Sequence, residues 1–299
     1  MDIRHLRAFV TVAGTLNFRK AADQLCMTQP PLSHAIKSLE EELGVLLLNR
    51  EQKKNVQLTV AGKKFLVAAQ RILHDVERAK TMAKLSVEGH FGSLSIGFTD
   101  DFIFGTLPDL FNDFSLEYPN ARLFISQDKS YQLIDRLNLN EFDCIFTTQP
   151  SQKISSNLKV SKWAETPIVV VVPNNHKLAG ESEISLSQLS DERFLMDVHS
   201  LRSRFDDQIC KLLINAGISP ENNIEVNDTM MCYELVHRGY GVVLASLDST
   251  PFREGHNKVI KLKDDGAKLE RVLICRKDNN SSVLERFLEM TNKYNKKSD

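Results

Sequence analysis

Five side chains between residues 29 and 37 are of the kinds that contact DNA. Gln29, Pro30, Ser33, His34 and Lys37 recur at spacings of three and four, so a helix presents them on one side. Small, amide, hydroxyl, imidazole and ammonium groups in this arrangement suit the major groove, where base edges offer hydrogen-bond donors and acceptors. A simpler interpretation is that they solvate the outside of a helical hairpin. The flanking segments decide between the two.

Two short helices must position this face, and each buries one apolar stripe. The apolar residues at helical spacing are Phe18, Ala22 and Leu25 in the first helix, and Leu32, Ile36, Leu39 and Leu43 in the second. Thr28 is the expected N-cap of the second helix, and Pro30 and Pro31 are tolerated in its first turn. Gly44 is expected to end that helix in a left-handed conformation. The spacing therefore predicts two helices on one small core.

The flanks add a third helix and a basic hairpin. Apolar residues between positions 6 and 13 predict a helix on the same core, and Asn17 is expected to cap the helix that follows. Residues 45–48 and 56–58 are predicted strands around the polar loop 49–55. Its basic side chains are Arg50, Lys53 and Lys54. A hairpin of this kind lies against phosphates or enters a minor groove.

The N-terminal region resembles the LysR-type transcriptional regulators of bacteria. The segments that carry the resemblance are Met1 to Val10, Lys20-Ala21-Ala22, Thr28 to Ser33, Leu39 to Gly44 and Leu58 to Gly62. The resemblance implies a winged helix-turn-helix over residues 1–59 and extends over the whole chain. It implies promoter DNA and RNA polymerase as partners. The expected DNA contacts are Thr28, Gln29, Pro30, Pro31, Ser33, His34, Lys37, Arg50, Lys53 and Lys54.

Charge is distributed unevenly along the 299 residues. Residues 1–88 hold 14 Lys and Arg against 9 Asp and Glu, whereas the remainder holds 24 against 30, so the net charge of -1 combines a basic and an acidic part. The phosphate-binding part is therefore expected at the N-terminus. No apolar run approaches the roughly 20 residues that a membrane span needs, and a signal-peptide pattern is absent. These features predict a cytoplasmic protein without a membrane partner.

The chemistry-bearing residues do not form an enzyme site. The eight histidines are dispersed, and neither a Gly-x-Ser-x-Gly elbow nor a phosphate-binding glycine loop occurs. Cys26, Cys144, Cys210, Cys232 and Cys275 are scattered without metal-binding spacing and are interpreted as reduced core residues. A redox switch at Cys210 is the alternative. We therefore expect no catalytic residue, metal or cofactor.

Residues 60–88 are predicted to form one long helix. The apolar residues Phe65, Ala69, Ile72, Val76, Ala79 and Ala83 recur at alternating spacings of four and three. This heptad seam with small residues predicts a homodimer. The alternative is a helix that packs on its own subunit. A dimer reads two half-sites of a near-palindrome, and the resemblance to LysR-type proteins implies a homotetramer.

Strands and helices alternate after a hinge at residues 89–92, and they predict an α/β sensor of two lobes. Lobe I is expected over residues 93–162 and 268–299, and lobe II over 163–267. The arrangement resembles periplasmic binding proteins, whose ligand lies between lobes at the carboxyl ends of strands. The predicted effector-binding residues are Thr99, Asp100, Asp101, Phe102, Ser130, Phe146, Thr148, Asp197, His199 and Asp228. A solute-binding protein is a remote alternative, which the first 88 residues disfavour.

The charge expected of the effector depends on the charged side chains predicted around it. Asp101, Asp197 and Asp228 are expected to converge, and clustered carboxylates favour a cationic amine or diamine. The alternative is that the aspartates are helix N-caps. His199 and the nearby arginines suit a small organic acid or aromatic carboxylate instead, as in the benzoate- and muconate-sensing members that the chain resembles. Both effector classes remain open at this point.

Overall fold

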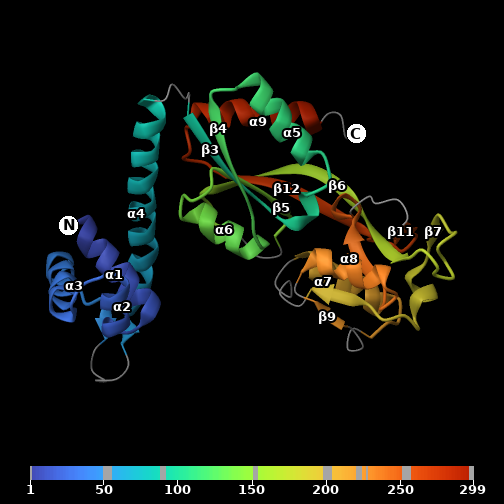
Figure 1. Ribbon diagram of the computed structural model, residues 1–299, viewed down its shortest axis with the longest axis horizontal. Helices are drawn as coiled ribbons and strands as arrows, with labels where there is room; N and C mark the ends of the chain where they lie inside the picture. Colours follow the sequence, from blue (N-terminus) through green and yellow to red (C-terminus); the bar gives the residue numbers. More distant parts are fainter. Residues whose placement is uncertain are drawn as a thin grey trace. The chain divides into compact units, whose positions relative to one another are not determined.

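The computed structural model describes residues 2–49, 56–87, 92–150, 154–197, 204–219, 224–226, 228–250 and 257–295. The chain forms two compact units, residues 1–89 with 139–141 and residues 90–138 with 142–299. Figure 1 shows the elements of each. Within the described ranges, every helix is too short or too polar to cross a membrane.

The first unit contains three short helices, a small hairpin and one long helix. They are α1 (Ile3–Thr15), α2 (Phe18–Gln24), α3 (Gln29–Leu43), β1 (Leu48–Asn49), β2 (Gln57–Leu58) and α4 (Val60–Val87). Leu6, Phe9, Leu32, Ile36 and Leu39 are fully buried in one shared core. The three-helix arrangement predicted from the apolar spacing is therefore confirmed.

The helix ends follow the sequence signals with one exception. The Asn17 side chain accepts hydrogen bonds from the backbone N–H groups of Arg19 and Lys20, as expected of an N-cap. Gly44 ends α3 with a φ of 68°, in the left-handed region that glycine enters without strain. Thr28 has the extended backbone of an N-cap, but its side chain makes no capping hydrogen bond in the described structure. The predicted role of its hydroxyl was wrong.

The hairpin is shorter than predicted, because its first strand is held by a helix. The carboxylate Oε1 of Glu40 accepts hydrogen bonds from the backbone nitrogens of Leu47 at 2.8 Å and Leu48 at 3.0 Å. The chain pairs as a strand only from Leu48, which lies opposite Leu58. Glu40 is buried with the apolar stripe of α3. Its carboxylate therefore joins α3 to the start of β1, the first strand of the hairpin.

The second unit is built on one mixed sheet with helices against it. Its strands are β3 (Gly92–Phe98), β4 (Ala121–Gln127), β5 (Cys144–Thr148), β6 (Leu158–Pro173), β7 (Glu183–Ile184), β8 (Leu195–Asp197), β9 (Ile224–Val226), β10 (Val243–Ser246), β11 (Asn257–Leu262) and β12 (Lys268–Arg276). The helices are α5 (Leu107–Glu117), α6 (Ser130–Asn138), α7 (Arg204–Asn215), α8 (Thr229–His237) and α9 (Ser282–Asn295), with short 3-10 turns η1 (Asp100–Phe102), η2 (Leu186–Leu189) and η5 (Leu247–Ser249). The predicted alternation of strands and helices is confirmed.

The long strand β6 belongs to both lobes. Residues 158–167 pair with β12 in lobe I, and residues 168–173 pair with β10 and β11 in lobe II. The strand order is β4-β3-β5-β12-β6-β11-β7, with β10 beside β6. Strands β8 and β9 form a separate parallel pair. A single continuous strand therefore carries the chain from one lobe into the other.

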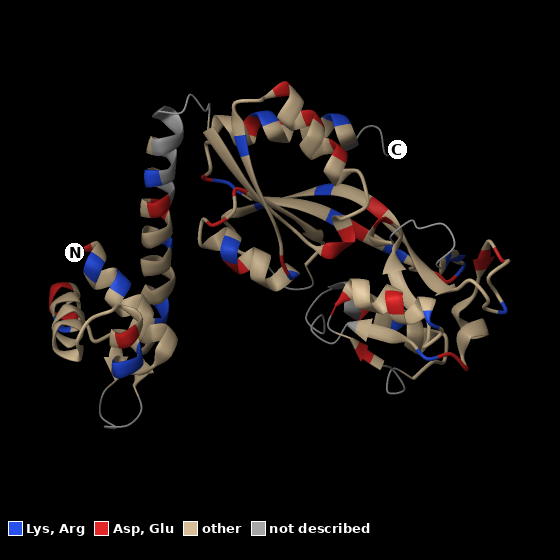
Figure 2. Ribbon diagram, in the orientation of Figure 1, with Lys and Arg blue, Asp and Glu red and all other residues tan. Residues whose placement is uncertain are grey.

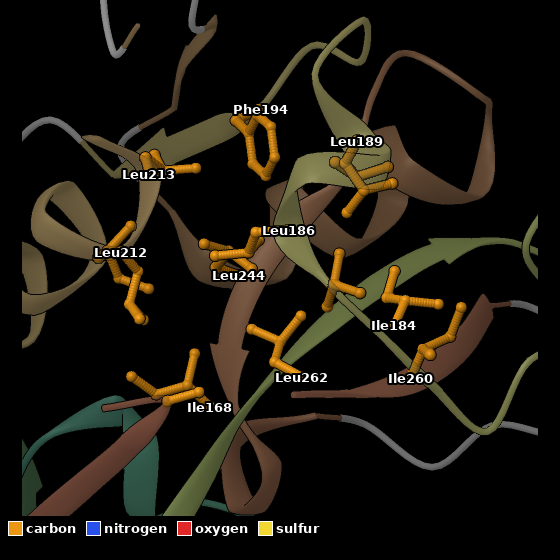
Figure 3. Packing of buried hydrophobic residues seen from close by; sticks show 14 of the residues in the cluster. Ile168, Ile184, Leu186, Leu189, Phe194, Leu212, Leu213, Leu244, Ile260 and Leu262 are labelled. Atoms are coloured by element: carbon orange, nitrogen blue, oxygen red, sulfur yellow. The ribbon is translucent and has the colours of Figure 1, made fainter. Parts of the chain in front are cut away.

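Each lobe has its own apolar core. Phe102, Phe114, Phe146 and Phe287 are buried in lobe I, where α5 and α9 pack on the sheet. The main core of lobe II lies around the second half of β6 and includes residues from η2, α7 and β11 (Figure 3). The lobes are thus separate packing units joined by β6 and the β11–β12 connection.

Candidate DNA interface and effector site

The predicted DNA-reading face of α3 points away from the core of the first unit. Gln29, His34 and Lys37 are exposed and Ser33 is half-buried, whereas Leu32, Ile36 and Leu39 of the same helix are fully buried. Thr28, Pro30 and Pro31 are exposed at its N-terminus. The structure therefore groups the predicted contacts of α3 on one accessible surface.

The interactions of this surface are weak enough to exchange for DNA. Lys37 Nζ lies 3.4 Å from Glu41 Oε1, with both side chains more than half exposed, and His34 Nδ1 lies 3.4 Å from Ser38 Oγ. An exposed ion pair contributes about 0 to 1 kcal/mol. Basic residues also lie along α1, α2 and α4 (Figure 2). The predicted wing residues Arg50, Lys53 and Lys54 lie outside the described residues.

The first half of the α4 seam packs on its own subunit. Ala69 is fully buried in the helix-turn-helix core, and the ring centroids of Phe65 and Phe9 are 5.5 Å apart. Ile72 packs against the same core, whereas Ala79 and Ala83 further along α4 are exposed. The alternative interpretation of the seam therefore holds for Phe65, Ala69 and Ile72.

Asp101 lies in the structure as a buried residue of lobe I. Its Oδ1 accepts a hydrogen bond from the Thr99 hydroxyl, and its side chain is 7% exposed. Burial raises the pKa of the Asp101 carboxyl from 3.8 to about 6; the Arg271 cation opposes this rise and Asp100 adds to it. Asp101 is therefore a buried residue and not an exposed one in the described structure.

The buried Arg271 carries the positive charge that faces the Asp101 and Asp248 carboxylates. It was not among the predicted site residues. Arg271 is 1% exposed, and its Nη1 donates to Asp248 Oδ2 at 2.6 Å and to the carbonyl of Asp101 at 3.0 Å. Its guanidinium carbon lies 4.1 Å from the centroid of the Phe102 ring. Arg271 lies opposite Thr148 on β5, and the sequence of β12, which also holds Lys268, Glu270 and Arg276, does not single it out.

Among the described residues, further polar contacts join the lobes beside the Arg271–Asp248 pair. Asp248 of η5 accepts from Thr166 Oγ1 at 2.9 Å, and its carbonyl accepts from the backbone nitrogen of Phe104 at 3.1 Å. Asp100 of lobe I accepts a hydrogen bond from the hydroxyl of Thr229, the first residue of α8 in lobe II. The structure thus brings Asp100 to the end of α8 that carries Asp228.

Asp228 has the N-cap role that was one of the two interpretations of it. Its Oδ1 accepts from the backbone nitrogen of Met231 at 2.8 Å, so it is the N-cap of α8, and its side chain is exposed beside Thr229. The side chain of Asp197 and the whole of His199 lie outside the described residues. The convergence of Asp101, Asp197 and Asp228 therefore stays a prediction, and the carboxylate that the structure places at the start of α8 is that of Asp100.

The remaining predicted effector residues divide between the two faces of the sheet. Ser130 Oγ accepts from Thr147 Oγ1 at 2.8 Å on the α6 side. Phe102 and Phe146 are fully buried in the lobe I core, with ring centroids 5.7 Å apart. Thr148 shares their face and is also buried. Phe102 and Phe146 are thus core residues of lobe I, in the same cluster as Cys144 on the same face of β5.

Other kinds of site find no support in the described residues. Their His, Cys, Asp and Glu side chains form no group of three that is able to hold a metal ion. The described cysteines are all free thiols, with Cys144, Cys232 and Cys275 buried, Cys210 half-buried and Cys26 exposed. The polar groups gather instead at the α3 surface and at the lobe junction.

Comparison with known proteins agrees with this division of the chain. Residues 3–63 match the model of the bacterial regulatory helix-turn-helix proteins of the lysR family, and residues 88–295 match the LysR substrate binding domain. The HTH-type transcriptional regulator BudR of Raoultella terrigena is 32% identical over 97% of this chain and 100% of its own length. AlsR of Bacillus subtilis (strain 168) is 28% identical over 98% of this chain and 96% of its own.

The fold is also that of a solved member of this family. The crystal structure of CbnR, a LysR family transcriptional regulator, superposes with a TM-score of 0.72 at 24% identity, over 98% of this chain and 99% of that one. The matched models and relatives describe transcriptional regulators and not enzymes. The chain therefore belongs to the LysR family and is a transcriptional regulator with a DNA-binding helix-turn-helix domain and an effector-binding domain.

Proposed function

We propose that the exposed face of α3 reads promoter DNA in the major groove. The observation that carries this proposal is the division of one helix into a buried apolar stripe and an exposed polar face of Gln29, Ser33, His34 and Lys37. The N-terminal residues of a recognition helix are those that contact base edges. The wing residues Arg50, Lys53 and Lys54 are proposed to bind phosphates, which orient the protein without selecting sequence.

Removing two groups from this face tests the proposal. A Ser33→Ala/Lys37→Ala double variant is expected to lose at least about tenfold in affinity for a promoter fragment selected by the full-length protein, because one base contact contributes about 1–3 kcal/mol. Fluorescence anisotropy at fixed salt measures the loss. Lys293→Ala, at an exposed position of α9, is the matched control. Unchanged specific affinity in the double variant refutes the assignment.

Self-association is proposed through the part of α4 that leaves the helix-turn-helix core. Ala79 and Ala83 are exposed there, and Val67 is 48% exposed nearer the start of the helix. Small residues allow two helices to approach closely, and a two-fold axis presents two α3 helices to two half-sites. Association of such dimers into a tetramer and contact with RNA polymerase complete the proposal. Sedimentation of the full chain as a monomer contradicts it.

The effector is proposed to bind at the lobe junction, where Asp100 meets Thr229. Ligand binding that exchanges this hydrogen bond changes the relative stability of lobe arrangements, which is the requirement for a switch. Asp100 and Asp228 are the two carboxylates that flank the start of α8, and Arg271 is engaged elsewhere by Asp248 and the Asp101 carbonyl. These charges support a cationic amine or diamine as the effector.

A thermal-shift panel on the full-length chain tests the effector class. 1,4-Diaminobutane at a hundredfold excess over Kd is expected to stabilise by about 2.7 kcal/mol, or about 5 to 10 °C for a domain of this size. Asp100→Asn and Asp228→Asn are expected to remove the shift, and Asp135→Asn on the exposed side of α6 to keep it. Stabilisation by benzoate alone, equal in all variants, contradicts the amine and supports the organic-acid alternative.

A further inference from the structure

Two of the five cysteines face each other on neighbouring strands. Cys144 begins β5 and lies directly opposite Cys275 near the end of β12 in an antiparallel register. Residues opposite each other in such a pair point to the same face of the sheet. Both thiols belong to the lobe I core, as do Phe146 and Leu273 two positions further along the same face. The sequence gives no hint of this pairing, because 130 residues separate the two positions.

The hydrogen-bond pattern identifies which kind of pair they form. The backbone nitrogen of Gln149 donates to the carbonyl of Glu270 at 2.9 Å, and these residues continue the register of β5 and β12. Hydrogen-bonded and non-hydrogen-bonded pairs alternate along antiparallel strands. Five positions away, Cys144 and Cys275 are therefore a non-hydrogen-bonded pair. In such pairs the Cα atoms are about 4.5 Å apart and the side chains approach most closely, within the Cα separations at which disulfides form.

We propose that Cys144 and Cys275 are a buried dithiol that an oxidant converts into a cross-strand disulfide. With a peroxide as oxidant, one thiolate attacks the peroxide oxygen, gains an S–OH group and releases water after proton transfer. The second thiol attacks that sulfur, the S–S bond forms and a second water leaves. Two thiols and one hydrogen peroxide give one disulfide and two waters, so the two electrons lost by sulfur reduce the peroxide.

The two sulfurs have different surroundings, and this difference indicates which thiol reacts first with the peroxide. Cys275 retains 6% exposure, and Lys159 and Arg276 oppose the rise that burial causes in its thiol pKa. Cys144 is fully buried, and burial with the nearby Asp143 raises its thiol pKa further. Cys275 is therefore the attacking thiol and Cys144 the resolving one. Because both pKa values are raised, we expect oxidation to be slow.

The position of the bond links it to the lobe junction. Along one face of β5 and β12 the opposed pairs are Cys144–Cys275, Phe146–Leu273 and Thr148–Arg271. Arg271 contacts Asp248 of the other lobe. A disulfide between Cys144 and Cys275 therefore joins β5 and β12 covalently, and these are the strands that carry Thr148 and Arg271. Formation of the bond does not depend on which effector the protein binds.

Peptide mapping of the full-length protein tests the proposal. The reduced native protein is incubated with hydrogen peroxide, alkylated with iodoacetamide in denaturant and digested without reductant. The expected product is one disulfide-linked peptide pair containing Cys144 and Cys275, two hydrogens lighter than the reduced peptides and restored by dithiothreitol. Cys144→Ala and Cys275→Ala are expected to abolish it, and Cys232→Ala, at another buried cysteine, to leave it unchanged.

The wild-type protein alone decides the outcome where a variant fails to fold. Recovery of Cys144 and Cys275 as separately alkylated thiols, after a treatment that oxidises both in the denatured chain, overturns the proposal. Linkage of either residue to Cys210 or Cys232 in the native protein overturns it as well. An increase in the thermal midpoint of the oxidised wild type, reversed by dithiothreitol, is the expected second readout.

Discussion

Replacing Asp101 with asparagine is expected to change how the stability of the effector-binding domain depends on pH. The Asp101 carboxyl is buried, and its pKa in the folded protein is about 6 against an ordinary value of 3.8. A raised pKa means that the folded state binds the proton more tightly than the unfolded state. The protonated group therefore contributes stability that is fully present below pH 3.8 and is lost as the pH rises through 6.

The magnitude follows from the size of this shift. Two pKa units correspond to about 3 kcal/mol, at about 1.4 kcal/mol per unit. Asparagine keeps an oxygen for the Thr99 hydroxyl but carries no titrating proton. Its amide nitrogen replaces Oδ2, which is buried without a hydrogen-bond partner among the described residues, and adds a cost that is independent of pH. Because part of this term is already lost at pH 4, the stability difference between variant and wild type is expected to move by about 2 kcal/mol in the variant's favour from pH 4 to pH 7.5.

Tryptophan fluorescence during urea unfolding measures the stability difference between variant and wild type in the effector-binding domain. Trp163 is the single tryptophan of the chain, it is 4% exposed, and its ring centroid lies 5.0 Å from that of Phe146. Its signal therefore reports on the lobe I core that contains Asp101. Asp135→Asn, at an exposed carboxyl of α6, controls for the general loss of an acidic group. Parallel pH curves for Asp101→Asn and wild type refute the assigned burial of the carboxylate.

Two further substitutions test the contacts that hold each unit together. Gly62→Ala is expected to destabilise the first unit by at least about 1–3 kcal/mol, because a Cβ at this position lies 2.1 Å from the carbonyl oxygen of Leu47. Circular dichroism during thermal unfolding measures the loss. The control is Gly14→Ala, whose added Cβ meets nothing within 4 Å. Asp248→Asn is expected to destabilise the second unit by about 2 kcal/mol. This is less than the 3–5 kcal/mol lost on breaking a fully buried ion pair, because the Asp248 side chain is 30% exposed while that of Arg271 is 1% exposed. Urea unfolding followed by Trp163 fluorescence measures the loss, and an unchanged midpoint contradicts the pairing.

Local sequence signals predicted the helix-turn-helix well, because its contacts join residues near each other in the chain. Apolar spacing identified the three helices, and Asn17 and Gly44 identified two of their ends. The exceptions were the Thr28 hydroxyl, which makes no capping hydrogen bond in the described structure, and the short wing strand, whose limit is set by Glu40. A glutamate on a charged helix end gives no sign that its carboxylate is buried and accepts two backbone hydrogen bonds from residues seven and eight positions ahead.

The lobe junction was predicted less well, because its decisive contacts join distant segments. Arg271 meets Asp248, Asp101 and Phe102 from strands and turns as much as 170 residues apart. The sequence places Arg271 in a segment with other charged residues and does not indicate that this arginine is internal. The first half of β6, residues 158–167, is likewise paired with a distant segment, the antiparallel strand β12.

The inter-lobe contacts differ in how easily a ligand exchanges them, and this difference limits where switching occurs. Asp248 is bound by Arg271, Thr166 and the Phe104 nitrogen, and separating these groups leaves a buried guanidinium uncompensated at a cost of several kcal/mol. The contact between Asp100 and Thr229 joins two half-exposed residues, so water or a ligand replaces it at little cost. A ligand shifts an equilibrium only by its differential affinity for the two states, typically 1–3 kcal/mol. We therefore expect the Asp248 cluster to act as the fixed pivot of the lobes and the Asp100–Thr229 contact as the part that an effector rearranges.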